Sequence, residues 1–384
     1  MRVSGDHGGR GKQRFLTLDV FRGMTVFLMI VVNTQGSGAV PYAAMMHAEW
    51  NGCTLTDLVF PSFVFAVGNA MAFTSPGVGK IFRRALLLFV AGWLLTWYPF
   101  TQPLGQVRVL AVLQRIALAY LIAALLVRGS KRAEVVRGSN RVEVEPLPGR
   151  WSDRWVLAAS VALLLGYWLL LELLGVRGQV YTVEGNAVRK IDLLILGPQH
   201  MYREKGIAFD PEGLLSTLPA VVNVLAGYMA GRWILRKKAS YEAVAGLLVT
   251  GVLLTGLAMI WEGWMPLNKK LWTSSYVVYT SGMDLIVLGI LFYFIEVRGG
   301  RKGTAFFSTF GKNPLFMYIL STMLGIFLVM RVKEGELFID WINRVFFQPM
   351  APGPMGALLF ALAYTLVCWC VGWVLDKKKI YIRL

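Results

Sequence analysis

Charged residues are scarce in this 384-residue sequence. Asp, Glu, Lys and Arg make up 16% of it, whereas they make up about a quarter of a typical soluble domain. Hydrophobic residues account for 56%. The deficit of charge falls in long apolar runs, so we expect lipid to be the solvent for most of the chain. This excludes an ordinary soluble globular protein.

Cysteine and histidine are equally rare, with three of each. Cys53, Cys368 and Cys370 lie within or beside apolar runs, and the last two do not have the spacing of a CxxC redox pair. A disulfide framework is therefore not expected. The sequence contains no phosphate-binding Walker loop, no GxSxG elbow and no HExxH motif. Without ligand spacing among so few histidines and cysteines, no metal site is predicted.

Long apolar runs are abundant instead. A helix needs about 20 mainly apolar residues to cross a bilayer, and helices satisfy their own backbone hydrogen bonds in lipid. The predicted fold class is therefore all-α: a polytopic transmembrane helical bundle of about ten helices. The predicted spans are 16–34, 53–74, 81–98, 107–128, 154–174, 213–235, 241–262, 273–296, 304–330 and 355–375.

Basic residues give the sequence a net charge of +17, and they concentrate in every second connection between the runs. Segments 80–84, 128–150, 236–238 and 377–379 are rich in Lys and Arg, whereas 331–354 mixes them with acidic residues. This distribution follows the positive-inside rule if the N-terminus is cytoplasmic. We therefore expect both termini in the cytoplasm and a multi-pass protein of the cell (inner) membrane. The expected partner of these basic residues is the lipid bilayer, and no nucleic acid is expected.

The chain is predicted to form a single transmembrane domain over residues 1–384. Helices 1–4 occupy about 16–128 and helices 5–10 about 154–375. Between them, 129–153 is basic and rich in Gly, Pro and Arg, which is typical of a cytoplasmic linker. The first apolar run has no small-residue cleavage site after it, so it is expected to be a retained helix.

His47 is the histidine whose neighbours suggest chemistry. It lies in a predicted outer loop with Trp50 and Asn51. An imidazole changes charge near neutral pH and can act as a general base; alternatively, His47 is an interfacial residue beside Trp50. Asp57, one turn into the second span, either partners the imidazole or a cation or caps the helix. Asn33 ends the first span at a similar depth.

A second polar group is predicted on the cytoplasmic side. Arg22 lies one turn after an aspartate, where it either forms an ion pair or faces an anion. Gln114 and Arg115 interrupt what we take to be the inner-facing part of the fourth span, and an intramembrane arginine suggests a functional site. Arg83 and Arg84 lie at the cytoplasmic edge. Together these side chains suit a ligand with phosphates, although positive-inside anchoring explains the edge arginines equally simply.

Three further motifs mark helix starts or a helix break. Residues 210–213 (Asp-Pro-Glu-Gly) open the sixth span, which helix capping can explain. Residues 268–273 (Asn-Lys-Lys-Leu-Trp-Thr) open the eighth, where the lysines either anchor at the interface or bind an acceptor. Residues 311–314 (Gly-Lys-Asn-Pro) lie in the ninth, where Pro314 is expected to kink the helix and place Asn313 at the break.

These motifs, taken in order, resemble the heparan-α-glucosaminide N-acetyltransferase family and its bacterial homologues, within the transmembrane acyltransferases. The most specific stretch begins at His47 and ends at Pro61, whereas the Asp-x-x-Arg-Gly element is shared more widely among membrane acyltransferases. The matching stretches are 18–23, 47–61, 112–117, 210–213, 268–273 and 311–314.

The resemblance implies a helical membrane bundle, commonly a homodimer, that transfers an acetyl group. The donor would be cytosolic acetyl-CoA and the acceptor the amine of a glucosamine-type sugar across the membrane. The family's catalytic histidine maps onto His47. The chain lacks the large N-terminal lumenal region of the lysosomal enzymes, so a small amino sugar or a cell-surface glycan is expected instead of polymeric heparan. From helix number alone, a transporter of amino sugars is the alternative.

Site roles follow from this resemblance as expectations. His47 would act as general base, with an acetyl-histidine intermediate as the competing scheme. Asp57 would orient it, and Asn33 or Asn313 would donate a hydrogen bond to the oxyanion. The residues expected to hold acetyl-CoA are Arg22, Arg83, Arg84, Gln114, Arg115 and Lys312. The residues expected to bind the acceptor are Trp50, Asn51, Asp210, Glu212, Asn268, Lys269 and Trp272.

Overall fold

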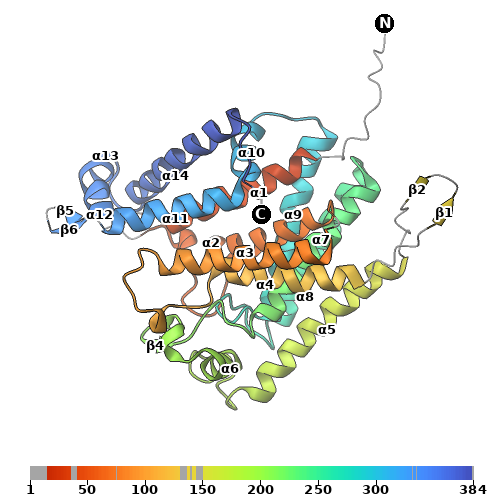
Figure 1. Cartoon of the computed structure of the whole chain (residues 1–384), viewed down its shortest axis with the longest axis horizontal. Coiled ribbons are helices and arrows are strands. Elements are labelled where there is room, and N and C mark those ends of the chain that lie inside the picture. The colour runs from red at the N-terminus through yellow and green to blue at the C-terminus, as the bar shows by residue number, and fades with distance from the viewer. Residues whose placement is uncertain are drawn as a thin grey trace, which may run out of the picture.

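The protein is a bundle of helices (Figure 1), which confirms the predicted all-α, polytopic fold class. The computed structural model describes residues 15–35, 41–74, 76–129, 136–138, 141–143, 150–330, 332–333 and 335–382. Helices occupy all ten predicted spans. They are α1 Leu16–Asn33, α2 Leu55–Met71, α3 Val78–Trp97, α4 Val112–Gly129, α5 Arg150–Leu174, α7 Thr217–Lys237, α8 Tyr241–Trp261, α9 Ser274–Phe292, α10 Thr304–Lys312 with α11 Pro314–Met330, and α14 Pro354–Lys377.

Six helices in the described part of the chain are long and apolar enough to cross a membrane. They are Leu16–Asn33, Asp153–Leu174, Thr217–Lys237, Tyr241–Trp261, Ser274–Val297 and Pro354–Lys377. A seventh arises if α10 and α11 are counted together, although the pair is bent by 84°. The break falls at Asn313 and Pro314, where the sequence predicted a kink. The full count of ten crossings stays a prediction.

Short elements connect the long helices. A small amphipathic helix, α6 (Ala187–Leu196), follows α5, and the sequence analysis did not predict it. The predicted linker 129–153 is only partly described, by one antiparallel hairpin and the first turn of α5. The remaining short elements are β1 Val136–Gly138, β2 Arg141–Glu143, β3 Arg203–Glu204, β4 Ile207–Ala208, β5 Val332–Lys333, β6 Glu336–Leu337, α12 Phe338–Ile342 and α13 Gln348–Met350.

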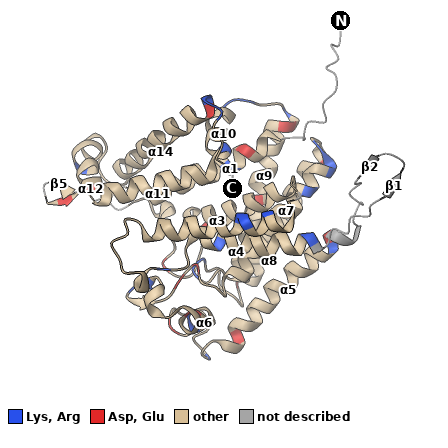
Figure 2. Cartoon of the chain, viewed as in Figure 1, with Lys and Arg blue, Asp and Glu red and all other residues tan. Residues whose placement is uncertain are grey.

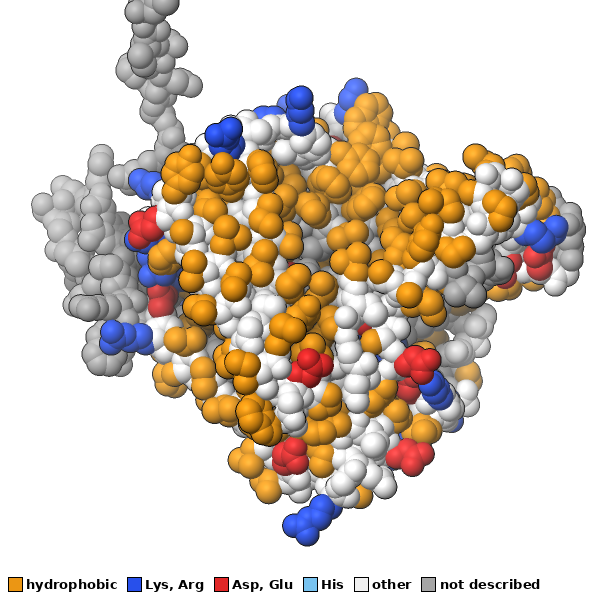
Figure 3. Space-filling view, turned by 180° about the vertical axis from the view of Figure 1, so that it is seen from behind, with side chains coloured by type: hydrophobic (Ala, Val, Ile, Leu, Met, Phe, Trp, Pro, Cys, Tyr) orange, Lys and Arg blue, Asp and Glu red, His pale blue; other side chains and the backbone are white. Residues whose placement is uncertain are grey.

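The centre of the bundle is formed by α2, α7 and α9, which bury most of their surface. Helices α2 and α7 cross at glycines: a Cβ on Gly68 would lie 1.8 Å from the Val224 carbonyl oxygen. The outer helices α5, α8, α11 and α14 carry long stretches without charge (Figure 2). Leu253 on α8 illustrates their exposed apolar faces, being 66% exposed. Figure 3 shows such hydrophobic side chains spread over much of one face of the molecule, as a lipid-embedded protein requires.

Hydrogen bonds tie the connections together at the two ends of the bundle. We call one end the histidine end, because it contains His47. Among the described residues, it comprises the segments 34–35, 41–54, 98–111, 175–216 and 262–273. The other, which we call the opposite end, contains the start of α1, where Thr17 bonds Glu296, and the ion pair of Lys312 with Asp376. This division decides which of the predicted site residues lie together.

Candidate active site

His47 lies in an extended loop just before α2, with its ring half exposed. Its Nδ1 is 2.7 Å from Oδ1 of Asp57, whose side chain is 1% exposed. An ionised carboxylate can only accept hydrogen bonds, so Nδ1 carries a proton and donates a hydrogen bond to Asp57. In the neutral imidazole with this tautomer, the other ring nitrogen, Nε2, has the lone pair. The pairing of His47 with Asp57, which the sequence offered as one of two alternatives, is present in the structure.

The second alternative for Asp57, a helix cap, is present as well. Its Oδ2 accepts hydrogen bonds from the backbone N–H groups of Ala48 at 3.0 Å and Thr54 at 3.1 Å, and from Thr54 Oγ1 at 3.0 Å. Thr54 and Asp57 thus form a capping box at the start of α2. The backbone oxygen of Asp57 also accepts a hydrogen bond from Tyr276 Oη at 2.6 Å. These hydrogen bonds therefore hold Asp57 in position independently of the imidazole.

Lys269 is the cation nearest to this pair. Its Nζ lies 3.0 Å from Nδ1 and 3.5 Å from Nε2 of His47, and 3.4 Å from Oδ1 of Asp57. Burial lowers the pKa of Lys269 below its ordinary value, although the charges of Asp57 and Glu212 oppose that shift. The sequence predicted Lys269 as an acceptor-binding residue. The structure places it against the histidine and its carboxylate.

The loop of Lys269 is bonded directly to the loop of His47. Gly52 N donates to the Leu267 oxygen at 2.7 Å, and Asn268 Nδ2 donates to Asn51 Oδ1 at 3.0 Å. Asn51 is exposed, whereas Asn268 is fully buried. Two predicted acceptor-binding residues therefore meet each other beside the site, but only Asn51 is accessible.

The two predicted acceptor-binding tryptophans lie in different surroundings. Trp50 is partly buried. Its Nε1 donates a hydrogen bond to the backbone oxygen of Tyr181 at 2.5 Å, and its ring contacts the Phe209 ring edge-on. Trp272 is 1% exposed, and its Nε1 donates to Asn223 Oδ1 at 3.0 Å. Trp272 is thus a packing residue beneath the site, with no surface open to an acceptor.

Arg108 was missed by the sequence analysis, yet it organises the predicted acidic motif. Its guanidinium donates to Asp210 at 2.9 and 2.6 Å and to Glu212 at 2.5 Å. Burial raises the pKa of Glu212, but the charges of Arg108 and Arg115 outweigh it, so this pKa lies below its usual value. Asp210 and Glu212 are therefore held together by one guanidinium in a buried charge cluster.

Arg115 and Gln114 lie at the histidine end, so the prediction that placed them on the side of the membrane away from His47 was wrong. Arg115 is fully buried, donates to Ser216 Oγ and lies 4.6 Å above the Trp272 ring. Its Nε and Nη1, and both polar atoms of the Gln114 side chain, have no partner among the described residues. The reason is that α4 enters the bundle at Val112 from the histidine end, so its first turn lies there.

The other residues predicted to hold acetyl-CoA lie at the opposite end. Arg83 is exposed, and Arg84 lies over the Tyr120 ring at 4.9 Å. Arg22 makes the ion pair that the sequence offered as one alternative: its Nη1 lies 3.8 Å from Oδ1 of Asp19. The same nitrogen donates a hydrogen bond to the backbone oxygen of Gly311. Lys312 pairs with Asp376 at 2.6 Å.

Asn313 is not brought together with His47. Its side chain bonds the backbone of Ile380 and Ile382 at 2.9 Å each, at the opposite end. The length of α1 separates the two ends by roughly 25 Å, at about 1.5 Å per residue. Asn33 lies exposed at the other end of α1, on the side of His47. Of the two candidate oxyanion donors, only Asn33 is at the correct end of the bundle.

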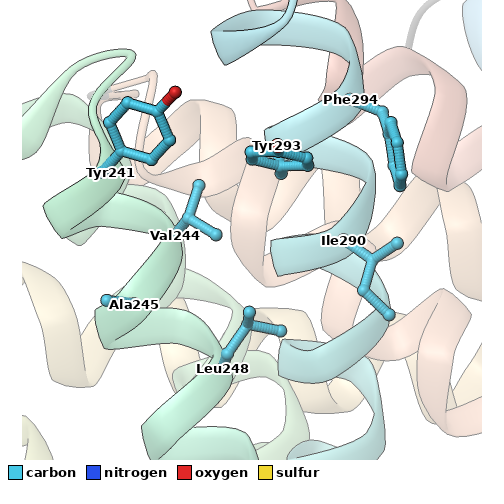
Figure 4. A pocket seen from close by; sticks show the side chains of 7 residues that line it. All are labelled: Tyr241, Val244, Ala245, Leu248, Ile290, Tyr293 and Phe294. Atoms are coloured by element: carbon cyan, nitrogen blue, oxygen red, sulfur yellow. The ribbon is translucent and has the colours of Figure 1, made fainter.

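Two cavities lie near or on the bundle. One of about 430 Å³ lies between α8 and α9 (Figure 4). Its walls are aliphatic and aromatic, and they suit an apolar chain and no acid–base chemistry. A second, of about 360 Å³, lies at the histidine end beside Asn51. Within the residues that the structure describes, no group of three His, Cys, Asp or Glu side chains is arranged to hold a metal ion.

Comparisons with known proteins point to one family. Residues 14–139 match the family model described as "Heparan-alpha-glucosaminide N-acetyltransferase, catalytic". The chain is 30% identical over 354 residues to the Homo sapiens heparan-alpha-glucosaminide N-acetyltransferase, covering 80% of this chain and 52% of that protein. For the Mus musculus protein the identity is 29% over 358 residues, covering 80% and 53%. The chain thus spans about half the length of these relatives, and the resemblance seen in its motifs is confirmed.

Proposed function

We propose that this chain, a homologue of the heparan-α-glucosaminide N-acetyltransferases, is a membrane-embedded acetyltransferase. It would move the acetyl group of cytosolic acetyl-CoA to the amine of a glucosamine-type sugar. One observation carries this proposal: the partly exposed His47 donates from Nδ1 to the buried Asp57 at 2.7 Å, which leaves Nε2 as a base.

In the proposed reaction, the acceptor amine attacks the thioester carbonyl while Nε2 of His47 takes a proton from that amine. A carbon–nitrogen bond forms, the carbon–sulfur bond breaks, and the departing thiolate takes the proton from His47. Asp57 stabilises the transient imidazolium through the hydrogen bond to Nδ1. Single-turnover labelling separates this direct transfer from the competing acetyl-histidine scheme. An acetylated enzyme trapped without acceptor would contradict direct transfer.

Lys269 supports the oxyanion in this proposal. A cation within 3.5 Å of the imidazole lies beside the point where the carbonyl oxygen gains charge, and fixed donors at such points supply much of the rate enhancement of acyl transfer. Asn33 stays a second candidate donor from the end of α1. Asn313 has no part in it, because its amide is bonded at the opposite end of the bundle.

The donor would bind with its charged nucleotide at the opposite end, near Arg83 and Arg84, and extend its thin arm between the helices. Basic residues concentrate there, as the positive-inside rule requires of a cytoplasmic face. Arg115 and Gln114 would then face the acyl end of that arm and not its phosphates. Location in the inner membrane, the outward position of His47 and a homodimer belong to the same proposal.

The direct test is acetylation of a panel of amino sugars by purified protein with acetyl-CoA. We expect His47→Ala to reduce kcat by about 10²-fold or more, the usual contribution of a general base. His200→Asn is the matched control, since His200 is bonded to a loop carbonyl and takes no part in the proposal. Wild type and His47→Ala of equal activity would remove the assignment, and amino-sugar flux without acetyl-CoA would favour the transporter.

A further inference from the structure

The cavity of about 360 Å³ at the histidine end has a lining that the proposed reaction does not use. It is bounded by Asn51, by Glu172 at the end of α5, and by the turn 178–182. Its size is near the lower limit of small-molecule sites, about 300–1,000 Å³. The lining combines backbone, amide, hydroxyl and carboxylate groups. Such groups suit a compact, hydroxyl-rich ligand better than an apolar one.

This cavity lies close to His47. The adjacent residues Asn268 and Lys269 touch Asn51 and His47 respectively, at 3.0 Å in each case. Asn51 follows His47 by four positions in the chain, which limits the distance between their Cα atoms to about 14 Å. The hydrogen bond from Trp50 Nε1 to the backbone oxygen of Tyr181 connects the turn 178–182 to the loop of His47. Asn51 therefore lines the cavity from the same loop that carries His47.

The polar groups of the cavity are arranged and not merely exposed. Glu172 Oε1 accepts a hydrogen bond from Tyr181 Oη at 2.6 Å, and Trp168 Nε1 donates to the same hydroxyl at 3.1 Å. Burial raises the pKa of Tyr181, as does its contact with Glu172, so the phenol stays protonated and keeps donating. Glu172 Oε2 and Asn51 Nδ2 make no hydrogen bond to any residue that the structure describes. They are left to accept from, and donate to, a ligand.

The charge of the lining is one-sided. Glu172 contributes a carboxylate, and no Lys, Arg or His side chain is among the residues that bound the cavity. A negatively charged ligand would be repelled here, because like charges at close range disfavour each other. A neutral or cationic group would be accepted. The cavity therefore selects by charge as well as by hydrogen bonding.

We propose that this cavity is an acceptor subsite for a second sugar unit, hydroxyl-bearing and without negative charge, joined to the amino sugar at His47. The inference rests on the proposed function and makes it specific: the acceptor is an oligosaccharide and not a single amino sugar. Glu172 and Asn51 hold the second unit. The unit next to the acetylated sugar is a neutral or amino sugar and not a uronic acid.

The test compares kcat/KM for three acceptors: glucosamine, a glucosaminyl disaccharide with a neutral second unit, and one with a uronic acid second unit. For wild type we expect the neutral disaccharide to exceed glucosamine by about tenfold, the effect of hydrogen bonding to a charged group. In Glu172→Gln, which keeps the acceptor for Tyr181, that ratio should fall toward one and the uronate should be less disfavoured. Ratios are read within one preparation, so loss of folded protein cancels.

Glu184→Gln is the matched control, because Glu184 is an exposed carboxylate nearby that does not line the cavity. It should leave all ratios unchanged, and Gln179→Ala in the cavity should act like Glu172→Gln. Disaccharide-to-monosaccharide ratios equal in wild type, Glu172→Gln and Gln179→Ala would overturn the subsite while leaving the proposed function standing. No acetylation of any acceptor by wild type would instead overturn both.

Discussion

Asp57 uses its two carboxylate oxygens for different purposes. Oδ2 completes the cap of α2 with Thr54, and Oδ1 holds the proton of His47. The sequence offered capping and histidine pairing as alternatives, but a buried carboxylate has enough acceptor sites for both. The helix start therefore fixes the position of the base.

Asp57→Asn should remove the charge that stabilises the imidazolium. The amide has one acceptor oxygen, so if it accepts from Nδ1, its NH2 group replaces Oδ2 and the cap bonds are lost; we expect kcat to fall about tenfold or more while KM changes little. Steady-state kinetics at saturating acetyl-CoA measure this. Thr54→Ala is the control: it removes a capping bond worth about 1 kcal/mol of stability but should retain kcat. Equal losses of kcat in the two variants would mean that Asp57 acts only as a cap.

Asp192 should make the stability of the protein depend on pH. Its Oδ1 accepts from Leu214 N at 2.9 Å, while Oδ2 is buried without a partner among the described residues. Burial, helped by the charge of Asp210, raises the pKa of Asp192 to about 7 from 3.8. The pKa of Asp192 is higher in the folded protein than in the unfolded chain. The contribution of protonated Asp192 to folding stability is therefore complete below about pH 4 and is lost as pH rises through about 7.

We therefore expect the thermal midpoint of the wild-type protein in detergent to fall more between pH 5 and pH 8 than that of Asp192→Asn. The asparagine keeps an acceptor for Leu214 N but cannot ionise. Comparing the two proteins removes the contribution of every other titrating group. Parallel pH profiles would contradict an elevated pKa at Asp192.

The residues that sequence analysis missed or misplaced share one property. Arg108 lies in a connection, and its partners Asp210 and Glu212 are about a hundred positions away, so no local pattern links them. Arg115 was assigned to the wrong end because its span was treated as a uniform apolar run, without reading which end of that run it occupied. His47 and Asp57 were found because they are ten residues apart and flank one helix start.

Helix packing in this protein depends on close approaches at glycine. A Cβ on Gly23 would lie 1.8 Å from the Phe307 oxygen where α1 crosses α10, and one on Gly227 would lie 1.9 Å from the Phe65 oxygen where α7 crosses α2. Small residues at such crossings allow backbones to approach in lipid. Hydropathy cannot reveal this, because glycines in lipid-facing positions look the same in the sequence.

Gly68→Ala should therefore be harmful, because its Cβ would lie 1.8 Å from backbone on α7 and the two helices must separate. We expect a loss of about 1–3 kcal/mol of stability, together with reduced activity, since α2 begins at the capping box of Asp57. Thermal unfolding in detergent gives the measurement. Gly256→Ala on α8, whose Cβ meets open space, should be neutral or stabilising. Similar thermal midpoints for both variants would refute the tight crossing.

Other features of the elements were within reach of sequence reasoning. Pro314 predicted the break between α10 and α11, since proline cannot donate the helix hydrogen bond. The angle of 84° was not predictable, because it depends on how α10 packs against α1. Helix α6 was not predicted as a separate element, since its ten residues are too few to span a membrane and fall between two predicted spans.

At the scale of the whole molecule, the bundle separates two kinds of chemistry. The histidine end holds His47, its carboxylate partner Asp57, Lys269 and a polar cavity. The opposite end presents Arg83 and Arg84. Apolar periodicity predicted this fold class, because lipid imposes it directly on composition, whereas the orientation inferred from Lys and Arg stays a prediction. The contacts within each end required the folded structure.

The most direct test of two-sided transfer uses sealed vesicles with acetyl-CoA on one side and a glucosaminyl acceptor on the other. Orientation is fixed by labelling a cysteine introduced at the exposed Ala43 in the loop before His47. We predict acetylated sugar only when the acceptor faces that cysteine and acetyl-CoA faces the other side, and none with His47→Ala. Product formed when donor and acceptor share one side but not when they are separated, or equal product from His47→Ala, would contradict the account.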